Sequence, residues 1–123
     1  MAEPDAPSRH HAALLDGGWR ELPFERLREG VDIHVLHAGE PSVALLRYAP
    51  GAHVPRHRHP GLETVLVLEG SQEDEHGHYP AGSLVVNGVG SEHAVRSGEG
   101  CVVLIQWTRP VEFLGADARA REG

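Results

Sequence analysis

Short apolar runs, separated by glycine, proline and other turn-forming residues, dominate the chain from residue 31 onward. Runs of this length, rich in Val, Leu and Ile and interrupted at short spacing, are typical of an all-β sandwich or barrel. The pattern predicts a hairpin turn at 75–77 and strands over 31–38, 42–48, 52–58, 62–69, 71–74, 83–87, 92–97 and 101–107.

The length of 123 residues favours a single small domain, which is large enough to bury a core. We expect the barrel to span residues 13–115. Residues 1–12 and 116–123 are polar, small or charged and offer little to bury, so we expect flexible segments there.

One strand-like segment carries a possible metal site. His57 and His59 stand one residue apart, and Glu63 follows four residues later. Side chains on a strand alternate between its two faces, so these three residues would share a face that continues into Val65 and Val67. The spacing therefore predicts two imidazoles and a carboxylate converging on one point.

Imidazole nitrogen and carboxylate oxygen suit a borderline divalent cation, namely Zn, Fe(II), Mn, Ni or Co. The chain has one cysteine, so it lacks the thiolates of a structural zinc cage. With ten histidines in the chain, close spacing can also arise by chance, and a solvated His-x-His pair is the alternative interpretation.

These residues resemble the first motif of the cupin superfamily, Gly-x5-His-x-His-x3-Glu-x6-Gly. Gly51, His57, His59, Glu63 and Gly70 fit this motif without a gap. The resemblance implies a single small cupin barrel, which is a double-stranded β-helix or jelly roll.

The second cupin motif, Gly-x5-Pro-x-Gly-x2-His-x3-Asn, is matched in part. Gly82, Gly90 and His93 are present, whereas Gly88 replaces the usual proline and Ser97 the usual asparagine. The departures affect the turn and leave His93 as the fourth metal ligand that the resemblance implies.

Within the cupins, the chain is most similar to the cupin-like domain of ChrR-type anti-sigma factors. The similarity rests on residues 56–61, 65–70, 74–82 and 99–101. It implies one metal ion per chain, commonly zinc, held by His57, His59, Glu63 and His93. Such anti-sigma factors carry an N-terminal sigma-binding module, and only some thirty residues precede the first clear strand here. We therefore do not expect this polypeptide by itself to inhibit a sigma factor.

Composition limits the classes of partner. A formal net charge of −7 with no basic block argues against nucleic acid or an anionic membrane surface as partner. No signal peptide or membrane-spanning run is recognisable, so we expect a cytoplasmic protein. Cys101, the lone cysteine, lies in an apolar strand and is predicted to be a buried thiol.

Other polar residues offer weaker signals. His76 and His78 are predicted to lie at a solvated hairpin tip, whereas His53 shares the sequence parity of His57 and could line the same cavity. Further candidates for a pocket, each of which could equally face solvent, are Arg47, Tyr48, Arg96, Gln106 and Trp107.

Two functions are compatible with a mononuclear cupin site. The favoured one is a metal-dependent enzyme of dioxygenase or isomerase type, acting on a small oxygenated organic molecule, with Glu63 as catalytic residue. The alternative is a non-catalytic zinc module that senses a ligand or an oxidant. The apolar stretches 43–46 and 102–105 would allow a homodimer, and burial in the core explains them equally well.

Overall fold

A computed structural model describes residues 7–115 of the chain. The predicted flexible segment 116–123, and residues 1–6 of the predicted segment 1–12, lie outside the described residues. No helix in the described part of the chain is long and apolar enough to cross a membrane.

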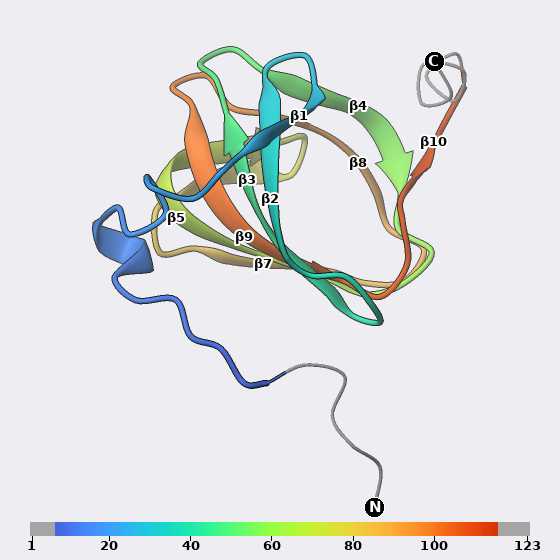
Figure 1. Ribbon diagram of the computed structural model, residues 1–123. Coiled ribbons are helices and arrows are strands. Elements are labelled where there is room, and N and C mark those ends of the chain that lie inside the picture. Colours follow the sequence, from blue (N-terminus) through green and yellow to red (C-terminus); the bar gives the residue numbers. More distant parts are fainter. Residues whose placement is uncertain (1–6, 116–123) are drawn as a thin grey trace, which may run out of the picture.

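The described residues form a short 3₁₀ helix and antiparallel strands (Figure 1). In chain order these are η1 (Leu14–Asp16), β1 (Glu25–Arg28), β2 (Val31–His37), β3 (Ser42–Tyr48), β4 (His53–Arg58), β5 (Glu63–Asp74), β6 (Gly77–Pro80), β7 (Leu84–Asn87), β8 (Glu92–Arg96), β9 (Cys101–Trp107) and β10 (Glu112–Phe113).

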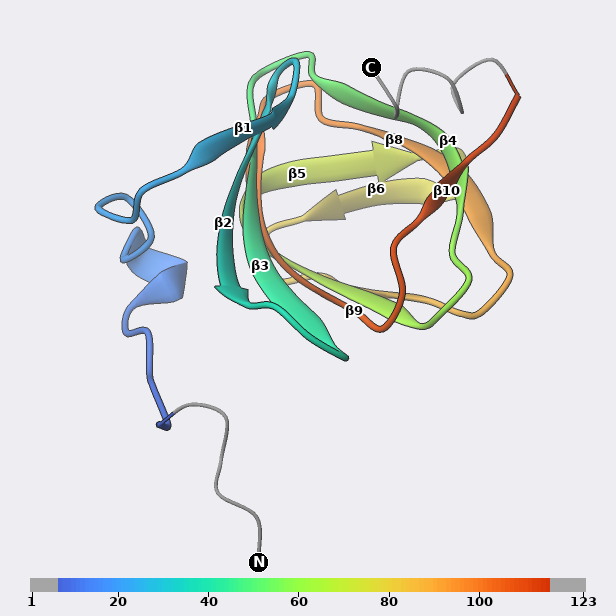
Figure 2. The same ribbon diagram turned by 45° about the vertical axis from the view of Figure 1, so that its right-hand side comes forward.

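The strands curl into a barrel with β5 shared between its two walls (Figure 2). One wall has the order β1-β2-β3-β9-β5, with β7 pairing along the first half of β5. The second half of β5 pairs with β6 and β8, and β8 continues to β4 and β10. The predicted all-β barrel is confirmed.

Gly70 lies where β5 passes from one wall to the other. We predicted separate strands over 62–69 and 71–74, and this division is wrong because the strand continues through Gly70. Its φ of 73° is one that glycine adopts without a steric penalty. A Cβ at this position would lie 2.0 Å from the carbonyl oxygen of Gly100. The glycine thus permits both the bend and the close approach of β9.

Three short strands, β1, β6 and β10, were not predicted, nor was η1. The residues of β1, Glu-Arg-Leu-Arg, are mostly exposed, and β10 has two residues. These short strands form because a neighbouring longer strand provides their hydrogen-bonding partners. Their own sequences carry too few apolar residues to show the alternation by which a strand is predicted.

Apolar side chains are buried on both faces of the larger wall. The cluster inside the barrel includes Leu46, Val65, Val67 and Val103. On the outer face, Leu45, Leu68 and Val102 pack with Trp19 from the segment before β1. Successive residues at 45–46 and over 102–105 alternate between these two clusters. Burial within one chain therefore explains their apolar character.

Candidate metal centre

Three histidines meet inside the barrel. His57 on β4 lies directly opposite His93 on β8, so their side chains share the inner face. His59 follows the end of β4 and is held by backbone hydrogen bonds, its amide donating to Ser91 and its carbonyl accepting from Gly90. The ring centroids lie 4.7–4.9 Å apart. His57, His59 and His93 are only 4%, 1% and 3% exposed.

Hydrogen bonds fix the proton on Nδ1 of two of these rings. His57 Nδ1 lies 2.8 Å from the carbonyl oxygen of Pro55, and His93 Nδ1 lies 2.9 Å from Oδ2 of Asp74. A carbonyl or carboxylate oxygen only accepts, so Nδ1 must be the donor in each pair. In the neutral imidazole the lone pair is then on Nε2.

Ser91 fixes the ring of His59 in the same way. His59 Nδ1 lies 3.1 Å from the carbonyl oxygen of Ser91 and 3.0 Å from its Oγ. The Ser91 hydroxyl donates to the carbonyl oxygen of Gly88, so its Oγ is an acceptor toward His59. All three histidines therefore present an Nε2 lone pair in their neutral form.

The donor set fits a metal ion. One ring nitrogen from each of His57, His59 and His93 lies within 4.8 Å of those of the other two. Nε2 of His59 and of His93 is buried without a hydrogen-bond partner. Buried polar atoms are normally satisfied, and a neutral imidazole Nε2 is a common ligand atom for divalent metals. The triad could hold a metal ion.

Glu63 stands beside His59 at the start of β5. Its Oε1 lies 3.3 Å from His59 Nε2 and accepts a hydrogen bond from Nδ2 of Asn87 at 3.0 Å. Glu63 and Asn87 are opposite each other in the β5–β7 pair, so they face the same side. With the His59 proton on Nδ1, two acceptor atoms face each other. Their contact is favourable only when a cation, either a metal ion or a proton, lies between them.

Burial and hydrogen bonding set the charge state of the groups around the triad. Burial lowers the pKa of His57, and the neighbouring His93 and His59 lower it further. Burial by itself would raise the pKa of Asp74, but hydrogen bonds from His93 and Tyr79 bring it below its usual value. At neutral pH the site therefore combines an uncharged His57 with a charged Asp74.

The prediction that residues 57–67 share one face is confirmed by their burial, and the predicted strands 52–58 and 62–69 correspond to β4 and the first part of β5. His57, His59, Glu63, Val65 and Val67 are all buried. As predicted, two strands carry them, because β4 ends at 58 and β5 begins at 63. The intervening segment keeps the alternation while it crosses from one wall to the other.

His53 points away from the site. Its side chain is exposed, although it shares the sequence parity of His57. The reason is a β-bulge, because the pairing of β4 with β8 shifts between Val54 and His57. A bulge inserts an extra residue and reverses the alternation on one side of it. The expectation that His53 could line the cavity is therefore wrong.

The pocket candidates divide between the two faces of the barrel. Tyr48 is buried in the inner core, and Trp107 lies opposite Glu63 across β5 and β9. Arg47 is on the outer face, where it pairs with Asp32 at 3.0 Å. Arg96 is exposed and pairs with Glu73, and Gln106 is exposed.

The second His-x-His pair behaves as predicted. His76 and His78 are exposed at the turn between β5 and β6. Asp74 of the same turn contacts His93 and was not predicted. Asn87 and Ser91 were also missed. A carboxylate directly before a turn and a serine three residues after Gly88 are signals of turn formation, and neither identifies the histidine contacted.

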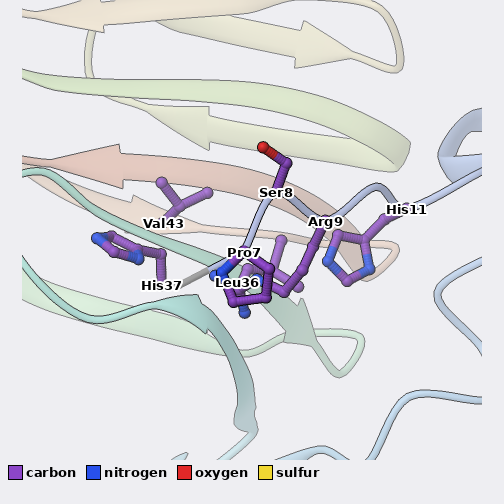
Figure 3. Close-up of a pocket in the computed structure, with 7 residues that line it drawn as sticks. All are labelled: Pro7, Ser8, Arg9, His11, Leu36, His37 and Val43. Carbon is purple, nitrogen blue, oxygen red and sulfur yellow. The ribbon is translucent and has the colours of Figure 1, made fainter. Parts of the chain in front are cut away.

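A separate hollow of about 430 Å³ lies outside the barrel, between the segment before η1 and the strands β2 and β3 (Figure 3). His37 and His11 stand at opposite ends of the hollow in this view, with Pro7 and Leu36 between them. None of the three histidines of the candidate metal centre contributes to its lining.

Comparison with known proteins places the chain among cupins. The family model described as the ChrR cupin-like domain matches residues 17–111. The anti-sigma-E factor ChrR of Cereibacter sphaeroides is 35% identical over 118 residues, covering 91% of this chain and 54% of that protein. The chain thus spans about half the length of this curated relative.

Solved structures agree with the family match. ChrR from Rhodobacter sphaeroides, in its complex with SigE, superposes with a TM-score of 0.67 at 31% identity, covering 71% of this chain and 50% of the other. A putative acetylacetone dioxygenase from Methylibium petroleiphilum has a TM-score of 0.76 at 12% identity, covering 96% and 88%, and this likeness supports the fold alone. Because the family model matches most of its length, the chain belongs to the family of ChrR cupin-like domains.

Proposed function

We propose that the chain binds one divalent transition-metal ion through His57, His59 and His93, with Glu63 as the fourth ligand. The proposal is carried by the buried Nε2 atoms of His59 and His93, which have no hydrogen-bond partner. Three nitrogen ligands and one oxygen ligand suit Zn, Fe(II), Mn, Ni or Co.

The favoured use of this site is catalysis on a small oxygenated organic molecule. A bound ion of this kind would supply Lewis acidity or, as iron(II), reactivity toward oxygen. The chain itself would orient Glu63 through Asn87 and exclude water, because both side chains are buried. A carboxylate in this position can hold a proton taken from the substrate, which is the role proposed for Glu63.

The family likeness favours a second candidate, a non-catalytic zinc module. The relative that covers 91% of this chain is an anti-sigma factor, and anti-sigma factors regulate rather than catalyse. In such a module the metal would link β4, β5 and β8, and a change at the metal would alter the barrel. Fold likeness by itself does not separate the two uses.

Elemental analysis of protein purified without added metal tests the site. We expect one ion per chain, and loss of most of it in His59→Ala and in His93→Ala. The matched control is His53→Ala, which removes an exposed histidine next to the bulge and should leave occupancy unchanged. Full occupancy in the His57→Ala/His59→Ala double variant would refute the assignment.

Glu63→Gln separates the two uses of the metal. The amide has the same size as the carboxyl group and leaves the three histidines unchanged. It lacks the negative charge and the ability to take up a proton. An enzyme should retain much of its metal and lose most of its turnover, measured as oxygen uptake by iron-loaded protein with a diketone, a thiol or a hydroxy acid. A zinc module should show only weaker binding and lower stability. Absence of oxygen uptake with each of these substrates in the unaltered protein would count against the enzyme.

A further inference from the structure

Asp74 connects the β5–β6 hairpin to the candidate metal centre. It is the last residue of β5, and its side chain is only 4% exposed. Its Oδ2 accepts the hydrogen bond from His93 Nδ1 at 2.9 Å. The ring of His93 is therefore held from the side that faces away from the other histidines by a residue nineteen positions earlier in the chain.

The other oxygen of Asp74 is fully engaged by the hairpin. Oδ1 accepts hydrogen bonds from the backbone amides of His76 and Gly77, at 2.8 and 3.1 Å, and from the hydroxyl of Tyr79 at 2.8 Å. All three partners are donors, so they select the acceptor form of this oxygen. The carboxylate cannot rotate away from His93 without breaking all three bonds.

Asp74 differs from the acceptors of the other two histidines. His57 and His59 donate to neutral oxygens, those of Pro55 and Ser91, whereas His93 donates to a carboxylate. Hydrogen bonds to an ionised acceptor are stronger, and a carboxylate behind a ligating imidazole fixes its tautomer and raises its basicity. His93 should thus be the strongest of the three nitrogen donors.

A separate metal site at Asp74 is the alternative explanation of this cluster, because Asp74, Glu75 and His93 also offer ligand atoms close together. Their atoms are already used. Asp74 Oδ2 is bonded to His93 Nδ1, and the Glu75 carboxylate accepts from Arg56 and from the amide of Ala94. With these contacts in place, the cluster is a support for His93 rather than a second site.

We propose that Asp74 is the positioning residue of the metal centre: it holds His93 with its Nε2 lone pair directed into the triad, and the hairpin 74–80 holds Asp74. This inference rests on the proposed metal site. It extends the site beyond the two histidine motifs to a hairpin that supplies no ligand of its own.

Asp74→Asn is the direct test, because the amide keeps the shape of the carboxylate and changes its hydrogen bonding. If the amide oxygen stays with the donors of the hairpin, the amide NH₂ faces His93 Nδ1, so the proton of the imidazole moves to Nε2. That proton would occupy the position of the metal. We expect metal affinity, measured by chelator competition, to fall about 10- to 100-fold.

Tyr79→Phe is the matched control. It removes one donor to Oδ1 and leaves the bond between Asp74 and His93 in place. We expect it to lower the melting temperature of the metal-free protein while leaving metal affinity unchanged. A role of Asp74 in the hairpin alone would give the same result for Asp74→Asn, and this outcome would overturn the inference.

Nitrogen NMR of the histidine rings in metal-free protein provides a second readout. We expect the Nδ1–H tautomer of His93 in the unaltered chain and in Tyr79→Phe, and its loss in Asp74→Asn. An unchanged tautomer in Asp74→Asn would refute the positioning role whether or not metal binds. If the tautomer changes as expected but the unaltered chain binds no metal, the proposed function fails and the support of His93 by Asp74 stands.

Discussion

Asn87 lies directly opposite Glu63 and donates its Nδ2 hydrogen to Oε1 over 3.0 Å. Both side chains are buried, so Asn87→Ala would leave a buried acceptor with one donor fewer. We expect the free energy of unfolding of the metal-free protein to fall by about 1–3 kcal/mol. Urea denaturation measures this loss.

The same pair can be tested by a double-mutant cycle. Glu63→Ala and Asn87→Ala each remove this hydrogen bond, so their effects on stability should not be additive, with a coupling of about 0.5–3 kcal/mol. Additive losses would mean that the hydrogen bond contributes nothing to stability.

The convergence of the candidate ligands was predictable from sequence because its signal is local. His57, His59 and Glu63 are close in the chain, and alternation along extended backbone turns all three inward even though two strands and a connection carry them. His93 was found through the likeness to the second cupin motif. Its position opposite His57 depends on pairing between β4 and β8, which spacing alone does not reveal.

The supporting residues were not predictable for the converse reason. Asp74 and Ser91 contact histidines that are 19 and 32 positions away, and their local sequence indicates only turns. The bulge before His57 was also not predictable from local sequence, because it is defined by the register between β4 and β8. His53 was misplaced because an unbroken alternation was extended through that bulge.

The bend of β5 gives a steric prediction. Gly70 and Gly82 both have positive φ, but a Cβ at Gly70 would meet Gly100 O at 2.0 Å and one at Gly82 would meet nothing within 4 Å. Gly82→Ala should cost about 1–2 kcal/mol of stability for the backbone conformation alone. Gly70→Ala should cost about 1–3 kcal/mol more, because backbone must move. Equal melting temperatures for the two variants would contradict this account.

Acidification should destabilise the metal-free protein. Burial lowers the pKa of His57 below its ordinary value of 6.5, so the unfolded chain takes up the proton first as pH falls. The stabilising contribution is present above about pH 6.5 and is lost as pH drops toward the lower pKa of the folded state. Urea denaturation from about pH 7.5 to about pH 5, roughly one unit or more on either side of the ordinary histidine pKa, should show that the free energy of unfolding decreases. His57→Gln should reduce the dependence of the free energy of unfolding on pH. An unaltered dependence would show that His57 is not its source.

The single thiol should be unreactive in the folded chain. Cys101 is 4% exposed, and burial raises the pKa of its thiol to about 11. Since the thiolate is the reactive species, a disulfide reagent at pH 8 should label native protein slowly and urea-unfolded protein at once. Rapid labelling of the native protein would show that β9 opens locally.

Access to the candidate metal centre should depend on Phe113. Strand β10 pairs Phe113 with His57, and the two rings lie 5.9 Å apart. Such a ring contact contributes about 0.5–1.5 kcal/mol, so Phe113→Ala should speed metal extraction by a chelator about 2- to 10-fold. Glu112→Gln is the control from the same strand, because it breaks only the exposed pair with Arg58, and exposed pairs contribute little. If both variants released metal at the rate of the unaltered chain, β10 would be a neighbour of the site without covering it.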